Sequence, residues 1–437
     1  MTIAQEIATF CRRSEAMPLA TEIGARARLC LADHLHAAMH GVRSETGGLM
    51  TRYLGSSGIA SGKEASAEAT ALFLGTTAAV HEIDDVHQDT SMHPGAVVIA
   101  AALALTTEEP VTGRRLLTAL TVGYEVAIRL SIAAGHRHYH FFHATATCGA
   151  LGAAAAAAII LGLDEERTAH ALAIAATSAS GLWEDINDTA VGIKHLHPGF
   201  AAERGVRAAK LARLGLRGAA RSIEGEKGFL AALAQPGAHA PGEVAPTGEA
   251  LREILLGGLG ARWAILRNIF KRYPFCLGCF EPLEGIRHIV AETAGRVDDI
   301  AAVRVEMCPP TASLVEQANP RDQFQAKFSA PFALALVLAG YDPERVPLPA
   351  EWLIEPTVRR WYPLVQVVGS ASIPRRRAVV TVTRRDGSRN RTDRPFRNLD
   401  EAQVWARFAA ACRQYLGARG PLLEERVARC AALSDAG

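Results

Sequence analysis

Apolar residues recur at helical spacing through most of the first 265 residues of the chain. Strand-like alternation is rare in this stretch, so its pattern predicts a succession of helices. The helices that the periodicity predicts are residues 25–40, 67–80, 97–105, 114–134, 148–161 and 167–178. Gly162 followed by Asp164 predicts a helix end and a new helix start, because glycine favours the left-handed C-terminal conformation and aspartate caps N-termini.

The pattern changes near residue 272. The dipeptide Tyr273-Pro274 ends any helix, since proline lacks an amide donor and clashes with the preceding turn. Residues 301–307 and 378–383 alternate apolar and polar side chains, which predicts two half-buried strands. The second strand is followed by Asp386-Gly387, a dipeptide typical of a hairpin turn.

Two domains follow from these patterns, because 437 residues exceed the usual size of one hydrophobic core. Residues 1–266 and 393–437 are predicted to form a large all-α domain built from both chain ends. Residues 267–392, with further helices at 281–293 and 330–338, are predicted to form a smaller α+β lid domain. The fold class expected is therefore mainly α.

Composition excludes some classes of function. A net charge of +2, with 49% apolar and 21% charged residues, gives no basic face for nucleic-acid binding. Residues 144–163 are long and uncharged enough to span a membrane, but they are rich in Ala and Gly, so we expect a helix buried among other helices. The N-terminal segment does not resemble a secretory signal, and eight scattered cysteines are typical of reduced thiols, so the predicted location is cytoplasmic.

Residues 81–93 are the densest titratable cluster, with three histidines and four carboxylates. Imidazoles and carboxylates at close range can hold each other in different protonation states, which general acid/base catalysis requires. The candidate residues in this cluster are Glu82, Asp84, Asp85, His87 and His93. The alternative is a solvated loop whose acids cap the next helix. The residue types also suit a metal, but no known ligand spacing such as HExxH occurs, so no metal is predicted.

Further clusters contain groups suited to bind a carboxylate. His143 and Thr145 stand at the start of the Ala-rich helix, where free backbone amides attract anions, although simple helix capping is the alternative. Lys194 and His197 form another cluster, and a surface lysine is the alternative there.

Lys271 and Arg272 lie at the predicted domain junction, where ligand pockets commonly form. Cys276 and Cys279 form a CxxC pair close by. A zinc site would need a second pair, and a redox dithiol would need a thioredoxin-like setting. The chain also lacks a P-loop, a GxGxxG motif after a strand and a GxSxG motif, which disfavours nucleotide-dependent and serine-hydrolase chemistry.

In this order and spacing, the clusters resemble the MmgE/PrpD family over nearly the whole chain. The segments that carry the resemblance are DDVHQDTSMHPGAVVIAAALAL, GYEVAIRL, FFHATATCGALGAAAAAA, IKHLHPGFAAERG, SIEGEKGFL and KRYPFC. It implies a homodimer whose interdomain cleft acts on a small polycarboxylate without metal or organic cofactor. Carried over residue by residue, it implies functional roles for Asp84, Asp85, His93, His143, Lys194 and Lys271.

Four positions depart from the family pattern, and each alters what the pocket can hydrogen-bond. Val86 replaces a threonine, Cys276 a histidine, Phe332 a tyrosine and Glu82 an aspartate. The assignment to any one substrate of the family is therefore open.

The chemistry implied is removal of a proton next to a carboxylate, with the resulting charge stabilised by Lys194, Lys271 and Arg272. The hypothesis makes His93, oriented by Asp84 or Asp85, the leading acid/base group. Further predicted groups are His143 as the second acid/base group and Glu82, His87, His197 and Thr145 as substrate contacts.

Dehydration of a hydroxy-polycarboxylate is the reaction expected first. Epimerisation of a dicarboxylate, with Cys276 as a second base, is the alternative, followed by decarboxylation. A non-catalytic binding protein on the same fold is the alternative from a different class, because fold does not fix function.

Overall fold

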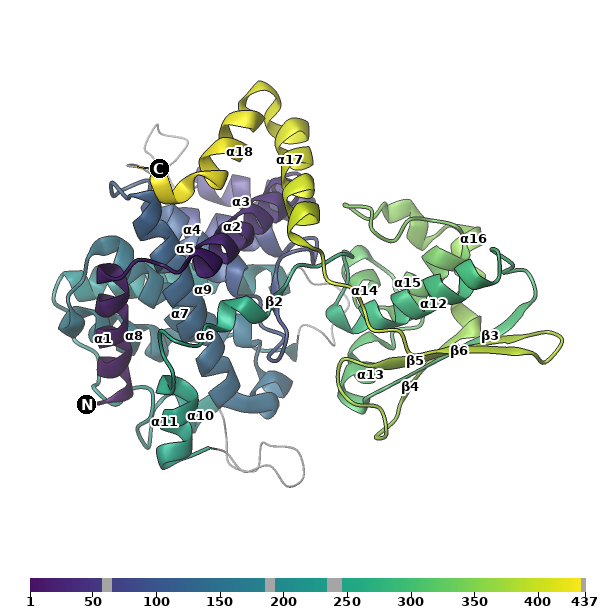
Figure 1. Cartoon of the computed structure of the whole chain (residues 1–437), viewed down its shortest axis with the longest axis horizontal. Coiled ribbons are helices and arrows are strands. Elements are labelled where there is room, and N and C mark those ends of the chain that lie inside the picture. Colours follow the sequence, from purple (N-terminus) through teal and green to yellow (C-terminus); the bar gives the residue numbers. More distant parts are fainter. Residues whose placement is uncertain (57–64, 185–192, 234–245, 434–437) are drawn as a thin grey trace.

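The computed structural model describes residues 1–56, 65–184, 193–233 and 246–433. Over these residues the chain is mainly helical, as predicted, with two small sheets. Figure 1 shows two units side by side, a large one made of helices and a smaller one in which helices pack on a sheet. We call them the helical unit and the α+β unit.

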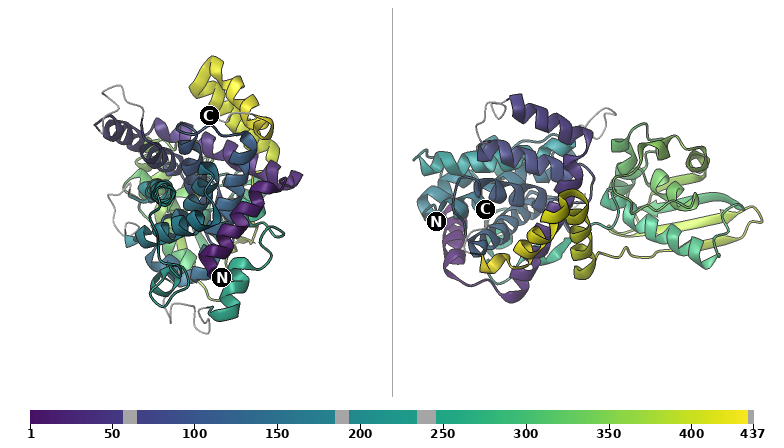
Figure 2. Two further views of the ribbon diagram at one scale, coloured as in Figure 1. Left: turned by 90° about the vertical axis from the view of Figure 1, so that its left-hand side faces the viewer. Right: turned by 90° about the horizontal axis from the view of Figure 1, so that it is seen from above.

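The helical unit contains most of the helices. They are α1 (Ile3–Ala16), α2 (Thr21–Val42), α3 (Glu45–Ser56), α4 (Ala67–Ala79), α5 (Pro94–Leu105), α6 (Gly113–Phe141), α7 (Ala144–Leu161), α8 (Glu165–Ser178), α9 (Ile193–Arg213), α10 (Phe229–Leu233), α11 (Gly248–Leu256), α17 (Glu401–Leu416) and α18 (Gly420–Ala428). Its hydrophobic core takes buried residues from Ile3 to Phe270 and again from Leu399 to Cys430. Helix α17 packs against α2, so the C-terminal helices lie on the N-terminal ones (Figure 2).

Helix α7 lies in the middle of this unit and contacts α5, α6, α8 and α9. Such a position accounts for a helix that is apolar on every side. Two helical segments, Gly113–Gly135 and Ala144–Leu161, are long and apolar enough to cross a membrane, but 94% of the apolar window of each is buried inside the protein. The predicted glycine stop is confirmed, because Gly162 has a φ of 67° and the Asp164 side chain caps α8.

The α+β unit is built on a four-stranded sheet of order β4-β3-β5-β6. The strands are β3 (Ile300–Met307), β4 (Val365–Gly369), β5 (Ala378–Arg384) and β6 (Arg389–Thr392). Strand β3 pairs in parallel with β4 and antiparallel with β5, which confirms both predicted strands and the hairpin. Strand β4 was not predicted, because its five residues, VQVVG, alternate only in part.

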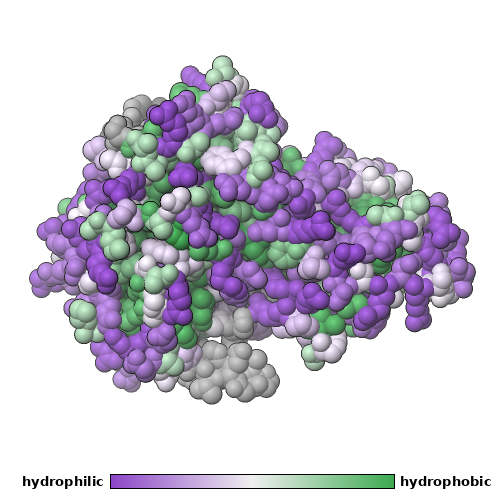
Figure 3. Space-filling view, viewed as in Figure 1, coloured by the Kyte–Doolittle hydropathy of each residue, from purple (hydrophilic) through white to green (hydrophobic). Residues whose placement is uncertain are grey.

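The helices of the α+β unit, some of them packed directly on this sheet, enclose a second core. They are α12 (Phe280–Glu292), α13 (Pro309–Val315), α14 (Gln323–Lys327), α15 (Ala330–Leu338) and α16 (Pro356–Arg359). Helices α12 and α15 contact each other as well as β5 and β4 respectively. Hydrophilic side chains cover most of the face in Figure 3, with hydrophobic residues gathered in patches mostly over the helical unit.

The two units meet where the chain passes from one to the other. Strand β1 (Val86–His87) pairs antiparallel with β2 (Asn268–Ile269). This short ladder attaches residues 80–93, the acidic and histidine-rich segment, to the start of the crossing. The densest titratable cluster of the sequence is thereby positioned at the junction between the units.

Candidate active site

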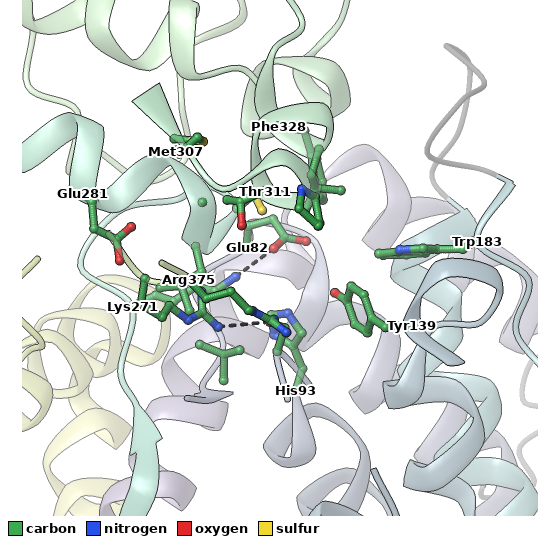
Figure 4. Close-up of a pocket in the computed structure, with 18 of the residues that line it drawn as sticks. Glu82, His93, Tyr139, Trp183, Lys271, Glu281, Met307, Thr311, Phe328 and Arg375 are labelled. Atoms are coloured by element: carbon green, nitrogen blue, oxygen red, sulfur yellow. Dashed lines mark hydrogen bonds and ion pairs between the residues drawn. The ribbon is translucent and has the colours of Figure 1, made fainter. Parts of the chain in front are cut away.

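A pocket of about 530 Å³ lies between the helical unit and the α+β unit. That volume is in the range of about 300–1,000 Å³ that small-molecule sites occupy. The helical unit contributes Glu82, Val86, Ser91, His93, Tyr139, His140, Trp183, Lys194 and Lys271 to its walls. The α+β unit contributes Cys276, Leu277, Gly278, Glu281, Met307, Pro310, Thr311, Leu314, Phe328, Arg375, Arg376 and Arg377 (Figure 4).

His93 is held by a buried carboxylate. Its Nδ1 lies 2.9 Å from Asp84 Oδ2, which leaves Nε2 as the ring nitrogen available to a ligand. The backbone also fixes the ring, because His93 immediately precedes Pro94 at the start of α5 and its amide donates to Thr145 Oγ1 at 3.1 Å. Burial raises the pKa of Asp84, but the charges of His93 and Lys271 outweigh burial and hold it below its usual range. Asp84 is therefore an ionised partner that sets the tautomer of His93.

Asp85 belongs to a hydrogen-bond network separate from that of His93. Its Oδ1 accepts from the Gly95 amide at 3.0 Å, and its Oδ2 accepts from Tyr124 Oη at 2.8 Å and Asn268 Nδ2 at 2.6 Å. A Cβ at Gly95 would lie 2.5 Å from Asp85 Oδ1, so the close approach requires glycine. Of the two aspartates offered as the partner of His93, the structure selects Asp84. Asp85 fixes the start of α5.

Two lysines distant in sequence converge on one carboxylate in the pocket wall. Lys271 Nζ donates to Glu82 Oε2 at 2.8 Å (Figure 4). Lys194 pairs with Glu82 Oε1. All three side chains are buried, with exposed fractions of 5% or less. Burial lowers the pKa of both lysines, that of Lys194 well below its usual range because the charge of Lys271 adds to the effect, whereas the charge of Asp84 opposes the shift of Lys271. The predicted anion-binding lysines therefore lie in the same pocket as His93.

Two cations of the α+β unit reach across to the segment of residues 80–93. Lys327 Nζ donates to the Val80 carbonyl at 2.6 Å, and burial lowers the pKa of Lys327 to about 8. Arg376 Nη2 donates to the Gln88 carbonyl at 3.1 Å and to Ser91 Oγ at 3.0 Å. These contacts tie the wall that carries His93 to the opposite unit.

Strained backbone also gathers at this pocket. Among the described residues, the only non-glycine residues with positive φ are Glu82 (55°), Ser91 (59°), Ala294 (52°) and Arg376 (61°). Three of these four line the pocket. Left-handed conformations cost free energy in ordinary residues and cluster where function requires a particular side-chain placement. The strained backbone positions and the buried charged side chains therefore occur at the same pocket.

Three of the predicted histidines do not line the pocket. His143 Nδ1 lies 3.1 Å from His197 Nδ1, and the His143 ring stacks on Trp183 with centroids 4.4 Å apart. Burial lowers the pKa of His197 to about 4 and that of His143 further below its usual range, so both rings are neutral. His87 Nδ1 contacts Thr90 Oγ1 at 3.2 Å. These three rings therefore support the pocket wall without lining the pocket. Thr145 also acts indirectly, because its Oγ1 accepts a hydrogen bond from the His93 amide.

Arg272 requires a correction. Its guanidinium contacts Gln403 at 3.3 Å and Glu344 at 3.5 Å, and it lines a different cavity beside α12 and α17. Lys271 and Arg272 follow each other in the irregular segment after β2 and point to different cavities. Arg272 therefore does not line the pocket that holds Lys194 and Lys271, where the prediction placed it.

Among the described residues, no three His, Cys, Asp or Glu side chains converge as a metal ion would need. The cysteines of the CxxC pair, Cys276 and Cys279, are both buried free thiols. The aromatic and apolar lining residues, among them Tyr139, Trp183 and Phe328, enclose the charged groups. The arrangement can bind a small anion between buried cations and move a proton at His93.

Residues 5–240 match the MmgE/PrpD N-terminal domain, and residues 273–429 match the MmgE/PrpD C-terminal domain. The chain belongs to the MmgE/PrpD family. Cis-aconitate decarboxylase of Homo sapiens is 29% identical over 276 residues, which are 60% of this chain and 54% of the relative.

Two further relatives carry the same name. Cis-aconitate decarboxylase of Aspergillus terreus is 24% identical over 273 residues, 59% of this chain and 54% of the relative. The Mus musculus protein is 36% identical over 166 residues, 35% of this chain and 32% of the relative. The matched part of this MmgE/PrpD chain thus spans about half the length of these relatives, or less.

The structure shows which of the four departures from the MmgE/PrpD pattern lie in the pocket. Glu82, Val86 and Cys276 all line the pocket, so they alter the surface that a ligand meets. Phe332 does not. It is buried in the α+β core, with its ring centroid 6.2 Å from that of Phe275, so the expectation that a missing phenol changes this pocket is corrected.

The sequence analysis missed Glu281, Lys327 and the run Arg375 to Arg377 as functional residues of this MmgE/PrpD chain. Three consecutive arginines immediately before a predicted strand are a signal that could have been weighed, since such a run attracts anions. Glu281 and Lys327 stand in helical or short irregular segments without any such pattern. Only the folding of the α+β unit against residues 80–93 brings Glu281 to the pocket wall and Lys327 to the Val80 carbonyl.

Proposed function

We propose that this protein is a lyase that removes a proton next to a carboxylate of a small hydroxy-di- or tricarboxylate and expels the hydroxyl group as water. The observation that carries the proposal is the presence of His93, paired with Asp84, in one pocket with buried Lys194 and Lys271. A base and fixed cations are what this chemistry needs.

The proton transfer begins at His93. With Nδ1 held by ionised Asp84, His93 accepts the C–H proton at Nε2. Negative charge then develops on the neighbouring carboxylate, where Lys194 and Lys271 stabilise it without having to reorganise. Glu82, which holds both lysines, keeps them in place before the substrate arrives.

In this proposal, the arginines of residues 375–377 bind the remaining carboxylates of the substrate. They line the pocket from the α+β unit, opposite the segment that carries His93. A substrate with two or three carboxylates can therefore contact cations on both walls. Dehydration leaves every carboxylate charged, so a pocket rich in cations stabilises both the substrate and the product of that reaction.

Decarboxylation is the second candidate, because the curated relatives are named cis-aconitate decarboxylases. A carboxylate that leaves as CO2 must give up its charge, and close cations oppose that change. The apolar part of the wall, with Leu277, Met307 and Leu314, is where such a group would have to lie.

A substrate panel in D2O distinguishes the reactions. The purified protein is incubated with hydroxy-di- and tricarboxylates and with their unsaturated counterparts, and products are followed by NMR, mass spectrometry and CO2 release. Loss of water with formation of a C=C bond supports dehydration. CO2 release supports the second candidate, and deuterium incorporation without mass loss beyond exchange supports epimerisation. Ligand-induced stabilisation without turnover of any compound would contradict an enzymatic role.

A further inference from the structure

Glu281 is a buried carboxyl group in the pocket wall, and one of its two oxygens has no hydrogen-bond partner in the described parts of the chain. It lies in the first turn of α12 and is 4% exposed. Its Oε1 is buried and has no hydrogen-bond partner among the described residues. Buried polar atoms are almost always paired, because an unpaired one costs free energy. Glu281 also lines the pocket, so its carboxyl group is a candidate partner for a bound ligand.

The groups around Glu281 come from both walls. Arg376 and Arg377 act on it from the loop before β5, and Cys279 precedes it on its own segment. Across the pocket stand the groups of the helical unit, which are Glu82, His93, Lys194 and Lys271. Burial raises the pKa of Glu281 to about 7, although Arg376 and Arg377 pull it down. A substantial fraction of Glu281 is therefore protonated at neutral pH, unlike an ordinary surface glutamate.

We infer that Glu281 is the general acid that protonates the departing hydroxyl group. The inference rests on the proposed dehydration. His93 Nε2 takes the C–H proton, and the electron pair of that bond becomes the C=C bond. The C–O bond breaks, its oxygen takes the Glu281 proton, and water leaves. His93 then releases its proton to solvent, and the Glu281 carboxylate takes one back, so the enzyme is restored.

The placement of the two groups fits this division of labour. His93 belongs to the helical unit and Glu281 to the α+β unit, so a substrate between the walls meets a base on one side and an acid on the other (Figure 4). His143, which the sequence suggested as the second group, is fixed between His197 and Trp183 and does not line the pocket. Glu281 takes that role instead.

The first test compares Glu281→Gln with Glu284→Gln. Glu284 lies on the same helix but accepts from Tyr273 Oη at 2.7 Å and does not line the pocket. With a hydroxy acid that the wild type dehydrates, Glu281→Gln should lower kcat for water loss by about 10²–10⁴-fold, the usual contribution of a general acid. Exchange of the substrate C–H for deuterium should stay within about tenfold of wild type, because His93 is untouched. Glu284→Gln should match wild type in both assays.

A better leaving group sharpens the test. Fluoride leaves without being protonated, so an analogue with fluorine in place of the hydroxyl group should be turned over by Glu281→Gln at close to the wild-type rate. Loss of both water elimination and proton exchange in Glu281→Gln would instead mean that the residue only shapes the pocket, which overturns the inference.

The pH dependence supplies a second readout. Wild-type kcat should fall above about pH 7, as Glu281 loses its proton, and Glu281→Gln should lack that fall. The pKa of Glu281 in the folded protein lies above its ordinary value of 4.5. Ionisation of Glu281 therefore destabilises the fold increasingly from pH 4.5 to about 7 and fully above that pH. Glu281→Gln should therefore raise Tm more at pH 8 than at pH 5, whatever its activity.

The outcomes separate the two proposals. If the wild type dehydrates a substrate and Glu281→Gln does so equally well with the same pH profile, the role of Glu281 is refuted and the proposed function stands. If the wild type dehydrates nothing, the proposed function fails and the acid role fails with it. A Tm difference between pH 5 and pH 8 in that case would still show a buried acid at this position.

Discussion

The two walls of the pocket differ in how their charged groups are partnered. On the helical unit, Asp84 holds His93, Asp85 accepts three hydrogen bonds and Glu82 holds two lysines. On the α+β unit, Glu281 forms no ion pair with another described residue, and its Oε1, like Asp84 Oδ1 on the first wall, has no hydrogen-bond partner there. The first wall is organised before a ligand binds, as electrostatic catalysis requires. The second wall holds a carboxyl group that no described cation pairs with.

This comparison assigns different work to the two walls. A preorganised wall suits the base and the cations that must hold their positions while charge develops. The other wall suits acid transfer and recognition of the distant carboxylates. The following predictions test that division, from the largest expected effect to the smallest.

Replacing His93 with Ala should have the largest effect. It removes the base while leaving the α5 start, which depends on Asp85 and Gly95, in place. We expect turnover to fall by about 10²–10⁴-fold, with the fold intact but Tm lowered, because the buried Asp84 carboxylate loses its partner. Steady-state kinetics and thermal unfolding measure the two quantities. Turnover near the wild-type level would remove His93, and with it the proposed mechanism.

Lys271→Met should affect both stability and binding. It leaves the buried Glu82 carboxylate with Lys194 as its remaining partner. Breaking a buried ion pair costs about 3–5 kcal/mol of unfolding free energy, and we expect the lower end because Lys194 stays. Denaturant unfolding measures the loss. The control is Lys227→Met, an exposed lysine, which should change little. Equal stability of both variants would show that the Glu82 cluster does not hold this wall.

Substitutions of the two neighbouring aspartates should affect different properties of the protein. Asp85→Ala strands three buried donors, on Gly95, Tyr124 and Asn268, and should lower the unfolding free energy by at least about 2 kcal/mol. Asp84→Asn keeps its volume but no longer fixes the His93 tautomer, so it should reduce turnover with a smaller change in stability. The reverse pattern would mean that the two roles have been exchanged.

Arg376→Gln should have the smallest effect. It removes hydrogen bonds to Gln88 and Ser91 across the pocket, contacts worth about 1 kcal/mol together or somewhat more. We expect KM to rise by about tenfold or less while kcat changes little. Arg385→Gln, on the exposed turn after β5, is the matched control. A fall in kcat larger than the rise in KM would place Arg376 in the chemical step instead of in binding.

Much of the local structure could be predicted because it depends on neighbours in sequence. Helical periodicity predicted α2, α4, α5, α7 and α8, and the Gly162 stop follows from the backbone freedom of one residue. Helix α6 continues to Phe141, beyond the predicted end at residue 134, although Gly135 has a non-helical φ of 76°. The apolar periodicity ends before helix α6 does, because the last turns of the helix carry a run of histidines.

The candidate site could be predicted only in part. The segment of residues 81–93, together with Lys194 and Lys271, was visible as clusters of titratable residues, and these do share one pocket. Their partners were not visible. Nothing in the sequence distinguishes Asp84 from Asp85, or the inward Lys271 from the outward Arg272, because each pair consists of neighbours of like charge.

The sequence by itself therefore determined the helical character, the strands of the hairpin and the chemical types available at residues 81–93. The tertiary structure decided which of those groups face a ligand, and it alone added Glu281, Lys327 and the arginines of residues 375–377. The reason is physical. Helix and strand preferences act over a few residues, whereas burial, ion pairing and the pKa of a carboxyl group depend on which distant segments pack against it.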